Sequence, residues 1–539
     1  MLDKERREVP APRSLPPLEI VEDREKASGP DLTLRFVLTS LEIEGATVFS
    51  AAELAAPYES RYGKEVSFAE AQAIADALTR RYRAAGYLLS RVILPAGQTL
   101  DPQGARVRLA VIEGHIGSIR LVGDPALLER FRSYWREVEA RLLSYKPLRH
   151  ADFEREMLLL SDLPGIRVSS RFEEGEATGA SVLVFELTEK SWDASLNLGN
   201  TGTKSAGRGL ATVTLGFAWP VIGSRSSLSY TQARARGEYA AWTFAHAHSF
   251  SNGLNVDASW AQSRSTKPDS DFARVFDYET ESRTFTTCVL YPFLRSRNQN
   301  LSAGLRYEHR NGRSDLLDAP YTRDRLRSLT LEVNYDVSDA FLGGGVTQVI
   351  PAITRGLDWF DATDRDIEAS SPQAPARFTR YRLYLSRSQN LPARFSLLGS
   401  LSLQRTNAPL TSYYRESLGG SQFGRGYAPG VIENDNGLAA SLEARRDVMA
   451  GSLNLQPYIF LDWGKTWSRA RTDNGDRGEE YLSSAGLGLR LSGLFGTPDS
   501  KALYVPRFSL NLFYAKPLRA VGEVDTSNKR IMAQGIFSF

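Results

Sequence analysis

The sequence lacks long apolar runs, disulfide-forming cysteines and most of the residues that bind metals. No stretch reaches the roughly 18 to 20 apolar residues that a membrane-spanning helix needs, so the class of helical membrane proteins is excluded. Cys288 is the single cysteine and forms no internal disulfide. Among five histidines, His246 and His248 share one face of a predicted strand, but no cysteine or carboxylate nearby completes a metal site. We therefore expect no metal and no cofactor.

A large excess of one charge is also missing. Lys and Arg number 66 and Asp and Glu 63, giving a net charge of +3, which argues against a polyanion-binding tail and a nucleic-acid partner. The amino terminus has no apolar segment of the kind that signal peptides carry, so no signal peptide is visible. No Ser/His/Asp set or pair of acids has convincing spacing, and we do not expect an enzyme.

One glycine-rich stretch stands out, GGSQFGRGYAPG at residues 419–430, with Arg425 and Tyr427 among its glycines. Its spacing fits neither the dinucleotide fingerprint nor the P-loop, and no strand-then-helix context follows. A nucleotide site is therefore disfavoured, and the stretch is predicted to be the tip of a long hairpin.

A pattern of one strand, two helices and two strands occurs twice near the front of the chain. In the first copy, residues 35–114, "LRFVLTSLEIEG" alternates as a strand does, and capping boxes of Ser50 with Glu53 and Ser67 with Glu70 open the two helices. The segments "YLLSRVIL" and "ARVRLAVIEG" are the closing strands.

The second copy, residues 115–190, repeats this order. "IGSIRLVG" is a predicted strand, Asp124 caps a helix that starts at Pro125, and a second helix ends at Pro164 and Gly165. Each copy would be a small α+β layer with one free sheet edge. A structural spacer and a module that captures an extended peptide along this edge are equally compatible with the spacing.

The two ends of the chain read differently from the repeats. Residues 1–34 are Pro-rich and charged, which predicts a linker with a possible short plug helix. Residues 191–539 lose the helical signal and show short alternating segments such as "SLLGSLSLQ", "RYRLYLSRS" and "PRFSLNLFY".

These alternating segments predict a transmembrane antiparallel β-barrel. The polar face carries Arg and Ser and suits a wet lumen, because an arginine facing lipid at mid-depth costs about 2 to 4 kcal/mol. An open sheet would leave its edges unpaired in lipid. At roughly 20 to 22 residues per strand with its connection, the segment holds about 16 strands.

Turn signals and the final segment complete the barrel reading. The turn signals are Asn252-Gly253, Asn311-Gly312, Asn434 to Gly437 and Asn474-Gly475. The chain ends in "RIMAQGIFSF", with Phe537 and Phe539 on one face, which predicts a last strand that closes on the first.

Two such repeats followed by a barrel resemble the outer-membrane transporters of the two-partner secretion pathway (TpsB, FhaC/ShlB-like) of the Omp85 superfamily. "LPAGQTLDPQGARVRLAVIEGHIGSIRLVG" and "LLLSDLPGIRV" resemble the polypeptide-transport-associated (POTRA) domains of that family. "GGSQFGRGYAPG" resembles its pore loop, with Gly424, Arg425, Gly426 and Tyr427 at the matching positions. A second family motif, F-x-D-x-G, matches Phe460, Asp462 and Gly464 in "YIFLDWGKTW".

The resemblance implies that the loop, at about residues 411–437, folds into the pore and that Arg425 meets Asp462. Strand alternation places Asp462 on the face of Tyr458 and Phe460, toward the lumen. In a water-filled pore we expect this pair to contribute only about 0 to 1 kcal/mol, so that its role is positional.

The implied function is a pore that recognises a TpsA-like exoprotein and moves it from the periplasm to the surface of a Gram-negative cell. The POTRA domains would lie in the periplasm and bind the exoprotein in extended form. The lipid bilayer, and the barrel-assembly machinery during biogenesis, are the other implied partners.

Other classes of function stay open at this point. A barrel- or autotransporter-assembly factor of the same superfamily is the nearest alternative, although the resemblance to those factors implies three or more POTRA domains. A porin-like passive pore would leave the paired modules without a purpose, and an outer-membrane enzyme would need a catalytic set at the barrel rim.

Overall fold

The computed structural model describes residues 18–20, 35–203, 207–235, 237–266, 277–469, 478–494, 506–522 and 524–539. Contacts divide the chain into two units, one ending at Glu189 and the other running from Lys190 to Phe539. Each unit is described by itself. Within the described residues, no helix is long and apolar enough to cross a membrane.

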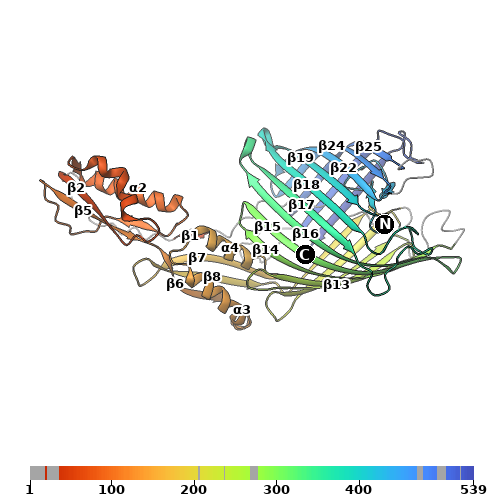
Figure 1. Ribbon diagram of the computed structural model, residues 1–539, viewed down its shortest axis with the longest axis horizontal. Coiled ribbons are helices and arrows are strands. Elements are labelled where there is room, and N and C mark those ends of the chain that lie inside the picture. The colour runs from red at the N-terminus through yellow and green to blue at the C-terminus, as the bar shows by residue number, and fades with distance from the viewer. Residues whose placement is uncertain are drawn as a thin grey trace. The chain divides into compact units, whose positions relative to one another are not determined.

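The first module has the predicted order of strand, two helices and two strands, with one short strand added (Figure 1). Its elements are β2 (Arg35–Glu44), α1 (Ala51–Ala55), a 3-10 helix (Ala56–Arg61), β3 (Glu65–Ser67), α2 (Phe68–Ala84), β4 (Arg91–Ile93) and β5 (Ala105–Ile112). They form a four-stranded sheet in the order β3-β2-β5-β4. The added strand β3 pairs antiparallel with the start of β2.

Both capping boxes of the first module are confirmed. Ser50 and Ser67 each accept from the backbone N–H of the glutamate three residues on, and each glutamate accepts from the N–H of its serine. This satisfies amide groups that the first helical turn leaves unpaired. Helix α2 then packs an apolar face on the sheet, where Ile74, Leu78 and Tyr82 are buried.

Glu113, just after β5, ties the loop after β2 to helix α2. Its carboxylate accepts hydrogen bonds from the backbone N–H groups of Thr47 (2.7 Å) and Val48 (2.9 Å), from the Thr47 hydroxyl and from the Tyr82 hydroxyl (3.0 Å). Burial alone would raise the pKa of Glu113, but these hydrogen bonds together outweigh it and lower the pKa below its ordinary value.

The second module consists of β6 (His115–Gly123), α3 (Pro125–Ser144), α4 (His150–Ser161), β7 (Ile166–Glu174) and β8 (Ala180–Glu189). Asp124 caps α3 by accepting from the N–H of Ala126 at 2.9 Å, and Pro125 occupies the first helical position. Helix α3 buries Phe131 and Trp135, and the Trp135 ring packs edge-on against Phe185 of β8.

A three-residue strand, β1 (Leu18–Ile20), extends the sheet of the second module. It pairs in parallel with residues 170–172 of β7, so the sheet order is β1-β7-β8-β6. The sequence reading of residues 1–34 as a linker therefore omits one strand. The possible plug helix lies outside the described residues.

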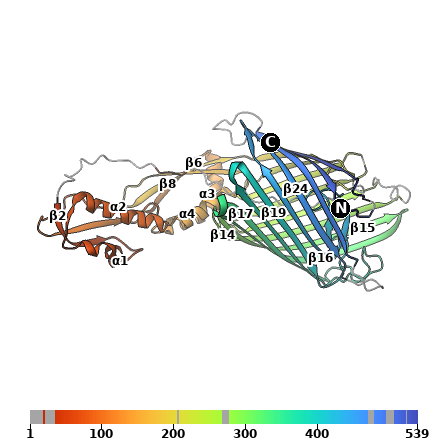
Figure 2. The ribbon, with the colours of Figure 1, turned by 90° about the horizontal axis from the view of Figure 1, so that it is seen from above.

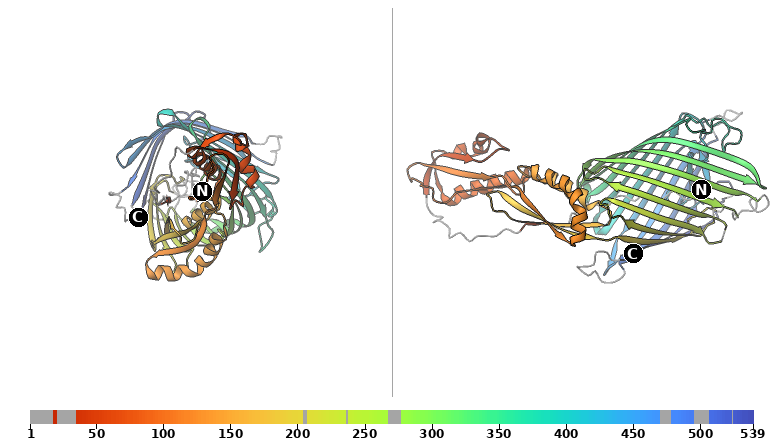
Figure 3. Two further views of the ribbon diagram at one scale, coloured as in Figure 1. Left: turned by 90° about the vertical axis from the view of Figure 1, so that its left-hand side faces the viewer. Right: turned by 90° about the horizontal axis from the view of Figure 1, so that it is seen from below.

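The second unit is a closed antiparallel barrel of 16 strands, as predicted, whose strands cross the wall obliquely (Figure 2; Figure 3). The strands are β9 (Trp192–Gly199), β10 (Leu210–Ala218), β11 (Ser224–Ala233), β12 (Ala240–Ser249), β13 (Asn255–Ser265), β14 (Glu279–Arg295), β15 (Gln299–Leu316), β16 (Ala319–Asp339), β17 (Gly345–Gly356), β18 (Thr379–Leu391), β19 (Phe395–Thr406), β22 (Asn436–Arg446), β23 (Val448–Ala450), β24 (Leu453–Trp467), β25 (Glu480–Leu494), β26 (Arg507–Pro517) and β27 (Arg530–Ser538). Short 3-10 turns occupy Phe341–Gly343 and Pro392–Arg394. Both β22 and β23 pair with β24 and are separated by Asp447 alone, so they count as one wall strand.

The barrel closes where its last strand pairs with its first. Strand β27 lies antiparallel to β9, and the N–H groups of Phe539 and Ala194 each donate to the carbonyl of the other, at 2.8 and 3.3 Å. Phe537 and Phe539 thus belong to the segment that makes the seam. Closure leaves no unpaired strand edge along the wall.

Alternation sorts the wall into an apolar outer face and an inner face. On β24, Ile459 and Leu461 expose 63% and 57% of their surface, whereas Tyr458, Phe460 and Asp462 between them are buried. The outer surroundings therefore contact only Ile459, Leu461 and the other residues of their parity, as expected for a strand that crosses a membrane.

Of the four predicted turns, one is confirmed, two are wrong, and Asn474-Gly475 lies outside the described residues. Asn434 to Gly437 do not reverse the chain, because β21 (Ile432–Asn434) ends at Asn434, β22 begins at Asn436, and only a bend at Asp435 separates them. Asn252-Gly253 lies in the tight turn between β12 and β13, but Asn311-Gly312 lies inside β15, and the chain reverses instead at Leu317 and Asp318. Both of these residues have positive φ, +50° and +61°, as the central residues of a type I′ hairpin turn require. Asn311 instead accepts a hydrogen bond from Arg327 on β16, at 3.0 Å, and the hairpin continues past it.

We predict that Glu113→Ala loosens the loop after β2 in the full-length protein. The lost hydrogen bonds to a charged acceptor should lower the local opening free energy by about 1 to 3 kcal/mol. Amide exchange of residues 46–49, corrected for the intrinsic rate, measures this change, and the exposed Glu65→Ala is the matched control.

The same contact predicts a pH dependence. Because the pKa of Glu113 is lowered in the folded state, its stabilisation is present above the ordinary carboxyl pKa and is lost as the pH falls through the folded-state value. Unchanged protection of residues 46–49 in Glu113→Ala, or greater protection at acidic pH, would contradict this account.

Candidate functional site

The connection between β19 and β22 folds back against the inner wall of the barrel. We call residues 407–435 the lumenal loop; it begins four residues before the predicted start. Within it, β20 (Glu416–Leu418) and β21 (Ile432–Asn434) form a short antiparallel hairpin. Its tip carries the GGSQFGRGYAPG stretch, and Leu418, Phe423, Tyr427 and Ile432 are buried in one apolar cluster with Leu482 of β25.

Arg425 is the centre of the tip. Its Nε and Nη2 donate to the two carboxylate oxygens of Asp462, at 3.1 and 2.8 Å, and its backbone N–H donates to Oδ2 of Asp462 at 2.8 Å. Nη2 also reaches the Ser441 hydroxyl at 2.9 Å. The guanidinium lies 3.5 Å from the centre of the Phe460 ring, a cation–π contact. Two of the three residues that the sequence singled out on β24, Asp462 and Phe460, therefore contact Arg425.

Glu443 on β22 is a second acid at this site. Nη1 of Arg425 donates to its Oε2 at 2.6 Å, and Arg445 and Arg490 lie 2.6 and 2.7 Å from its Oε1. The site therefore contains two carboxylates and three guanidinium groups. Glu443, Arg445 and Arg490 were not predicted as site residues. The sequence signal available for them was that all three share the inward parity of their strands.

Burial makes this a different interaction from the one expected in a wet pore. The side chains of Arg425, Asp462 and Glu443 expose 1%, 0% and 1% of their surface. The expected contribution of about 0 to 1 kcal/mol applies to exposed pairs and is wrong here. Removing one partner of a buried pair typically costs about 3 to 5 kcal/mol, since a charge is left without compensation.

The glycines of both motifs allow close approach. A Cβ on Gly426 would lie 2.8 Å from Ser484 Cβ and 2.8 Å from the Pro517 nitrogen, and Gly424 has a φ of +79°. A Cβ on Gly464 would lie 2.6 Å from Leu418 of the loop. Larger residues at these positions would push the loop away from the wall.

Tyr427 fixes the far side of the tip. Its hydroxyl lies 2.9 Å from the Ser483 carbonyl and 2.6 Å from the Arg519 carbonyl. Arg530 on β27 donates to the carbonyls of Gly420 (2.8 Å) and Tyr427 (2.7 Å). The tip is therefore attached to β22, β24, β25 and β27.

The stem of the loop is held at a different part of the wall. The hydroxyls of Tyr413 and Tyr414 donate to the two oxygens of Glu308 on β15, at 2.8 and 3.0 Å. Arg310 lies over the Tyr413 ring at 4.1 Å, and Arg380 on β18 lies over Tyr414 at 4.8 Å. Sequence reasoning missed this contact, because Glu308 lies 105 positions before Tyr413 and no local pattern links them.

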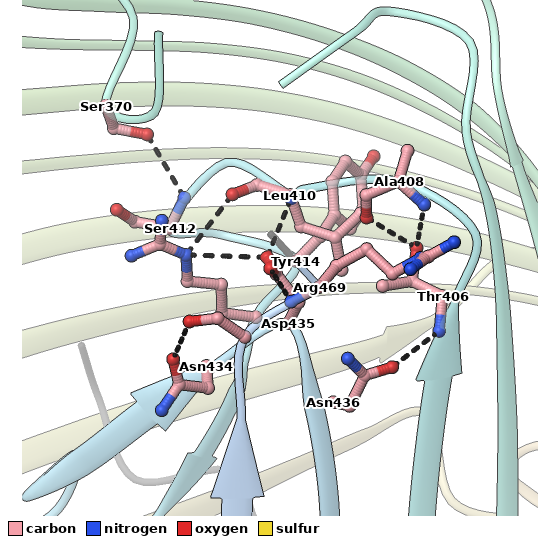
Figure 4. A network of polar contacts seen from close by, with 12 residues as sticks. Ser370, Thr406, Ala408, Leu410, Ser412, Tyr414, Asn434, Asp435, Asn436 and Arg469 are labelled. Atoms are coloured by element: carbon pink, nitrogen blue, oxygen red, sulfur yellow. Dashed lines mark hydrogen bonds and ion pairs between the residues drawn. The ribbon is translucent and has the colours of Figure 1, made fainter. Parts of the chain in front are cut away.

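Polar contacts join the two ends of the loop (Figure 4). The Asp435 carboxylate accepts from the N–H groups of Leu410 and Arg469, each at 2.8 Å. The Asn436 side chain accepts from the N–H of Thr406 at 3.0 Å. The N–H of Ser412 donates to Ser370 at 3.1 Å, which connects the stem to the residues between β17 and β18.

Within the described residues, no group of three or more His, Cys, Asp or Glu side chains is arranged to hold a metal ion. The site instead consists of ion pairs and hydrogen bonds that hold a loop. A closed antiparallel barrel with an inner loop fixed to its wall, preceded by two small α+β modules, defines an outer-membrane transporter of the Omp85 type.

Family comparisons identify the branch. The chain matches the family described as haemolysin secretion/activation protein ShlB/FhaC/HecB over residues 179–491, and the ShlB-type POTRA domain over residues 36–114. It belongs to the ShlB/FhaC/HecB family. The chain is thus a transporter of the two-partner secretion class, whose members export partner proteins through the outer membrane.

Individual relatives agree with this assignment. The heme/hemopexin transporter protein HuxB of Haemophilus influenzae (strain ATCC 51907 / DSM 11121 / KW20 / Rd) is 25% identical over 86% of this chain and 80% of its own length. The outer membrane transporter CdiB of Escherichia coli is 26% identical over 90% of this chain and 82% of its own.

Solved structures show the same fold. CdiB from Escherichia coli superposes with a TM-score of 0.70 at 20% identity, covering 96% of this chain and 92% of that one. BamA from Haemophilus ducreyi lacking POTRA domains 1-3 gives 0.51 at 13% identity, covering 94% and 100%. The family match favours secretion over the assembly-factor alternative.

We predict that replacing both Tyr413 and Tyr414 by Phe loosens the stem without moving the tip. Each lost hydrogen bond to the charged Glu308 should cost about 1.5 to 3 kcal/mol of stem docking. Amide exchange of residues 407–418 should rise, while residues 419–431 stay protected. Tyr458→Phe, which removes a hydrogen bond to Asn511 of the wall (2.8 Å), is the control. Equal exchange in the double variant and the wild type would refute the second attachment.

Proposed function

We propose that the modules lie in the periplasm, bind an extended segment of the partner exoprotein and deliver it to a barrel whose lumenal loop must leave its place before cargo passes. In this proposal residues 35–114 and 115–190 are the two POTRA domains and residues 191–539 the barrel. The proposal assigns Arg425, Asp462 and Glu443 to holding the loop rather than to chemistry.

The pairing of β1 supports capture along a sheet edge. Residues 18–20 add to β7 as an extended segment that uses backbone pairing, which is largely indifferent to sequence. Among the described residues, β1 pairs with three of the nine residues of β7, so a longer strand would have more of this edge to pair with. An exoprotein segment could extend along β7 in the same way, beside β1 or in its place.

The observation that carries the gating proposal is the buried contact of Arg425 with Asp462 and Glu443. Such a contact holds the loop strongly against the wall. When the loop is released, however, the charges are not left unpaired in apolar surroundings. If the loop left, water would enter the space and solvate both carboxylates, which limits the cost of release. A strong attachment that water can replace suits a loop that is either docked on the wall or released from it.

We predict that Arg425→Ala lowers secretion of the partner exoprotein at least tenfold while the barrel still inserts. Arg425→Lys should also fail substantially, since an ammonium cannot reproduce the fork that contacts both oxygens of Asp462. Export in cells producing both proteins measures secretion, and heat-modifiable migration reports barrel folding.

Arg306→Ala is the matched control for this prediction. Arg306 is an exposed residue of β15 with the inward parity of that strand. If Arg425 has a specific role that other lumenal arginines lack, Arg306→Ala should export normally. Binding of the exoprotein's amino-terminal segment to purified Arg425→Ala protein should be unchanged, because the modules are intact. Normal export by Arg425→Ala would sink the proposal.

A further inference from the structure

A row of alternating cationic and aromatic side chains crosses the outer face of the barrel between β19 and the end of β26. Arg405 of β19 lies over the Trp467 ring at 5.2 Å, and Lys465 lies 5.6 Å from Trp467 and 4.9 Å from Tyr481 of β25. Arg519, two residues past β26, lies over Tyr481 at 5.2 Å. We call these five residues the cation–aromatic row.

Strand parity places the row outside the barrel. On β24, Lys465 and Trp467 continue the set that begins with the exposed Leu461 and Trp463, whereas Thr466 is buried on the inner side. On β19, Arg405 is exposed and its neighbour Gln404 is buried. The side chains of the row are therefore separate from the lumenal site described above. Arg519 contributes only its backbone carbonyl to that site, and a side-chain substitution keeps this group.

The row begins where the apolar band ends. On β24 the outer residues change from Trp463 to Lys465 within two positions, which is roughly 7 Å along a strand. This change lies at the end of β24, at the same end of the barrel wall as the end of β19, where the lumenal loop begins. Tryptophan and tyrosine with basic neighbours at this depth are typical of the boundary between lipid tails and headgroups.

The cations of the row exceed the acids that contact them. In the part of the chain that the structure describes, Glu479 is the one carboxylate paired with them, 2.8 Å from Lys465. The opposite situation holds on β13 to β15. There the outward Arg264, Arg283 and Arg313 pair with Glu279, Glu281 and Asp315 at 2.8 to 3.5 Å.

We propose that the cation–aromatic row binds the phosphorylated sugar headgroup of a glycolipid in the adjoining leaflet. A guanidinium over an aromatic ring uses its face for that contact and keeps the N–H groups at its edge free to donate to phosphate oxygens. The Trp467 and Tyr481 rings, each flanked by two of the cations, add apolar surface beside the charges for a sugar ring. A phosphate diester without a sugar would use only the cations, so the aromatics favour the glycolipid.

The test compares lipid retention by full-length variants in phosphatidylcholine nanodiscs that contain diphosphorylated lipid A. The row variant combines Arg405→Gln, Lys465→Gln and Arg519→Gln. The matched control combines Arg264→Gln, Arg283→Gln and Arg313→Gln, three outward arginines whose charges are already paired. Native mass spectrometry counts the bound lipid, and heat-modifiable migration verifies folding.

The wild type and the control should retain lipid A equally, and the row variant should retain at least tenfold less. Trp467→Leu, which keeps all three cations, should lose lipid A severalfold while weak retention of phosphatidylglycerol is unchanged. The wild type should retain dephosphorylated lipid A as poorly as the row variant retains diphosphorylated lipid A.

Three results would overturn the inference. They are equal retention by the row variant and the wild type, an equal loss in the row and control variants, and retention of phosphatidylglycerol as strong as that of lipid A. Secretion by the row variant should stay within about twofold of wild type, so the outcome is separate from that of the loop proposal. If the triple variant fails to fold, Arg405→Gln alone and Trp467→Leu decide the question by the same readout.

Discussion

The arrangement of the lumen depends on one guanidinium group that compensates two buried carboxylates. Arg425 satisfies both oxygens of Asp462 and one oxygen of Glu443, all three side chains being almost fully buried. If the loop leaves, Glu443 keeps Arg445 and Arg490. In the described part of the chain, Asp462 would keep only the hydroxyls of Ser441 and Ser484. The position of the loop is therefore coupled to the hydration of Asp462, since an unpaired carboxylate is stable only in water.

The remaining contacts divide the loop into parts that can act separately. The tip is attached to β22, β24, β25 and β27, the stem to Glu308 on β15, and the base to Asp435 and Asn436. Tip and stem are thus fixed to different parts of the wall. The stem contacts include two hydrogen bonds from phenols and two cation–π contacts, and should be weaker than the buried ion pairs at the tip. Release could begin at the stem and leave the tip in place.

The period-two alternation allowed the barrel and the inward position of Asp462 to be predicted from the sequence. The contacts that depend on long-range strand pairing could not be predicted. Inward placement of Asp462 follows from its parity with Phe460, and the motifs brought Arg425 to it. Parity alone also places Glu443 on the inner face, but it does not place Glu443 beside Arg425, because Glu443 lies in an alternating segment without a motif. Its place beside Arg425 depends on the register that sets it opposite Phe460. The burial of the site was also missed, because it depends on the docking of a distant loop residue, Arg425, against Asp462 and Glu443, which no local pattern predicts. Asn311-Gly312 misled for a related reason, as neighbouring strand contacts extended the hairpin past a good turn signal.

The central claim is that the loop must leave the wall for cargo to pass, and a reversible cross-link tests it most directly. In a Cys288→Ser background, Gly426→Cys and Ser484→Cys place two Cβ atoms near 2.8 Å, and a shift of about 1 Å gives the spacing of a disulfide. The account predicts that the oxidised double variant exports a cysteine-free cargo at least tenfold less than either single variant, and that a reductant restores export. Full export by the oxidised, cross-linked protein would contradict it.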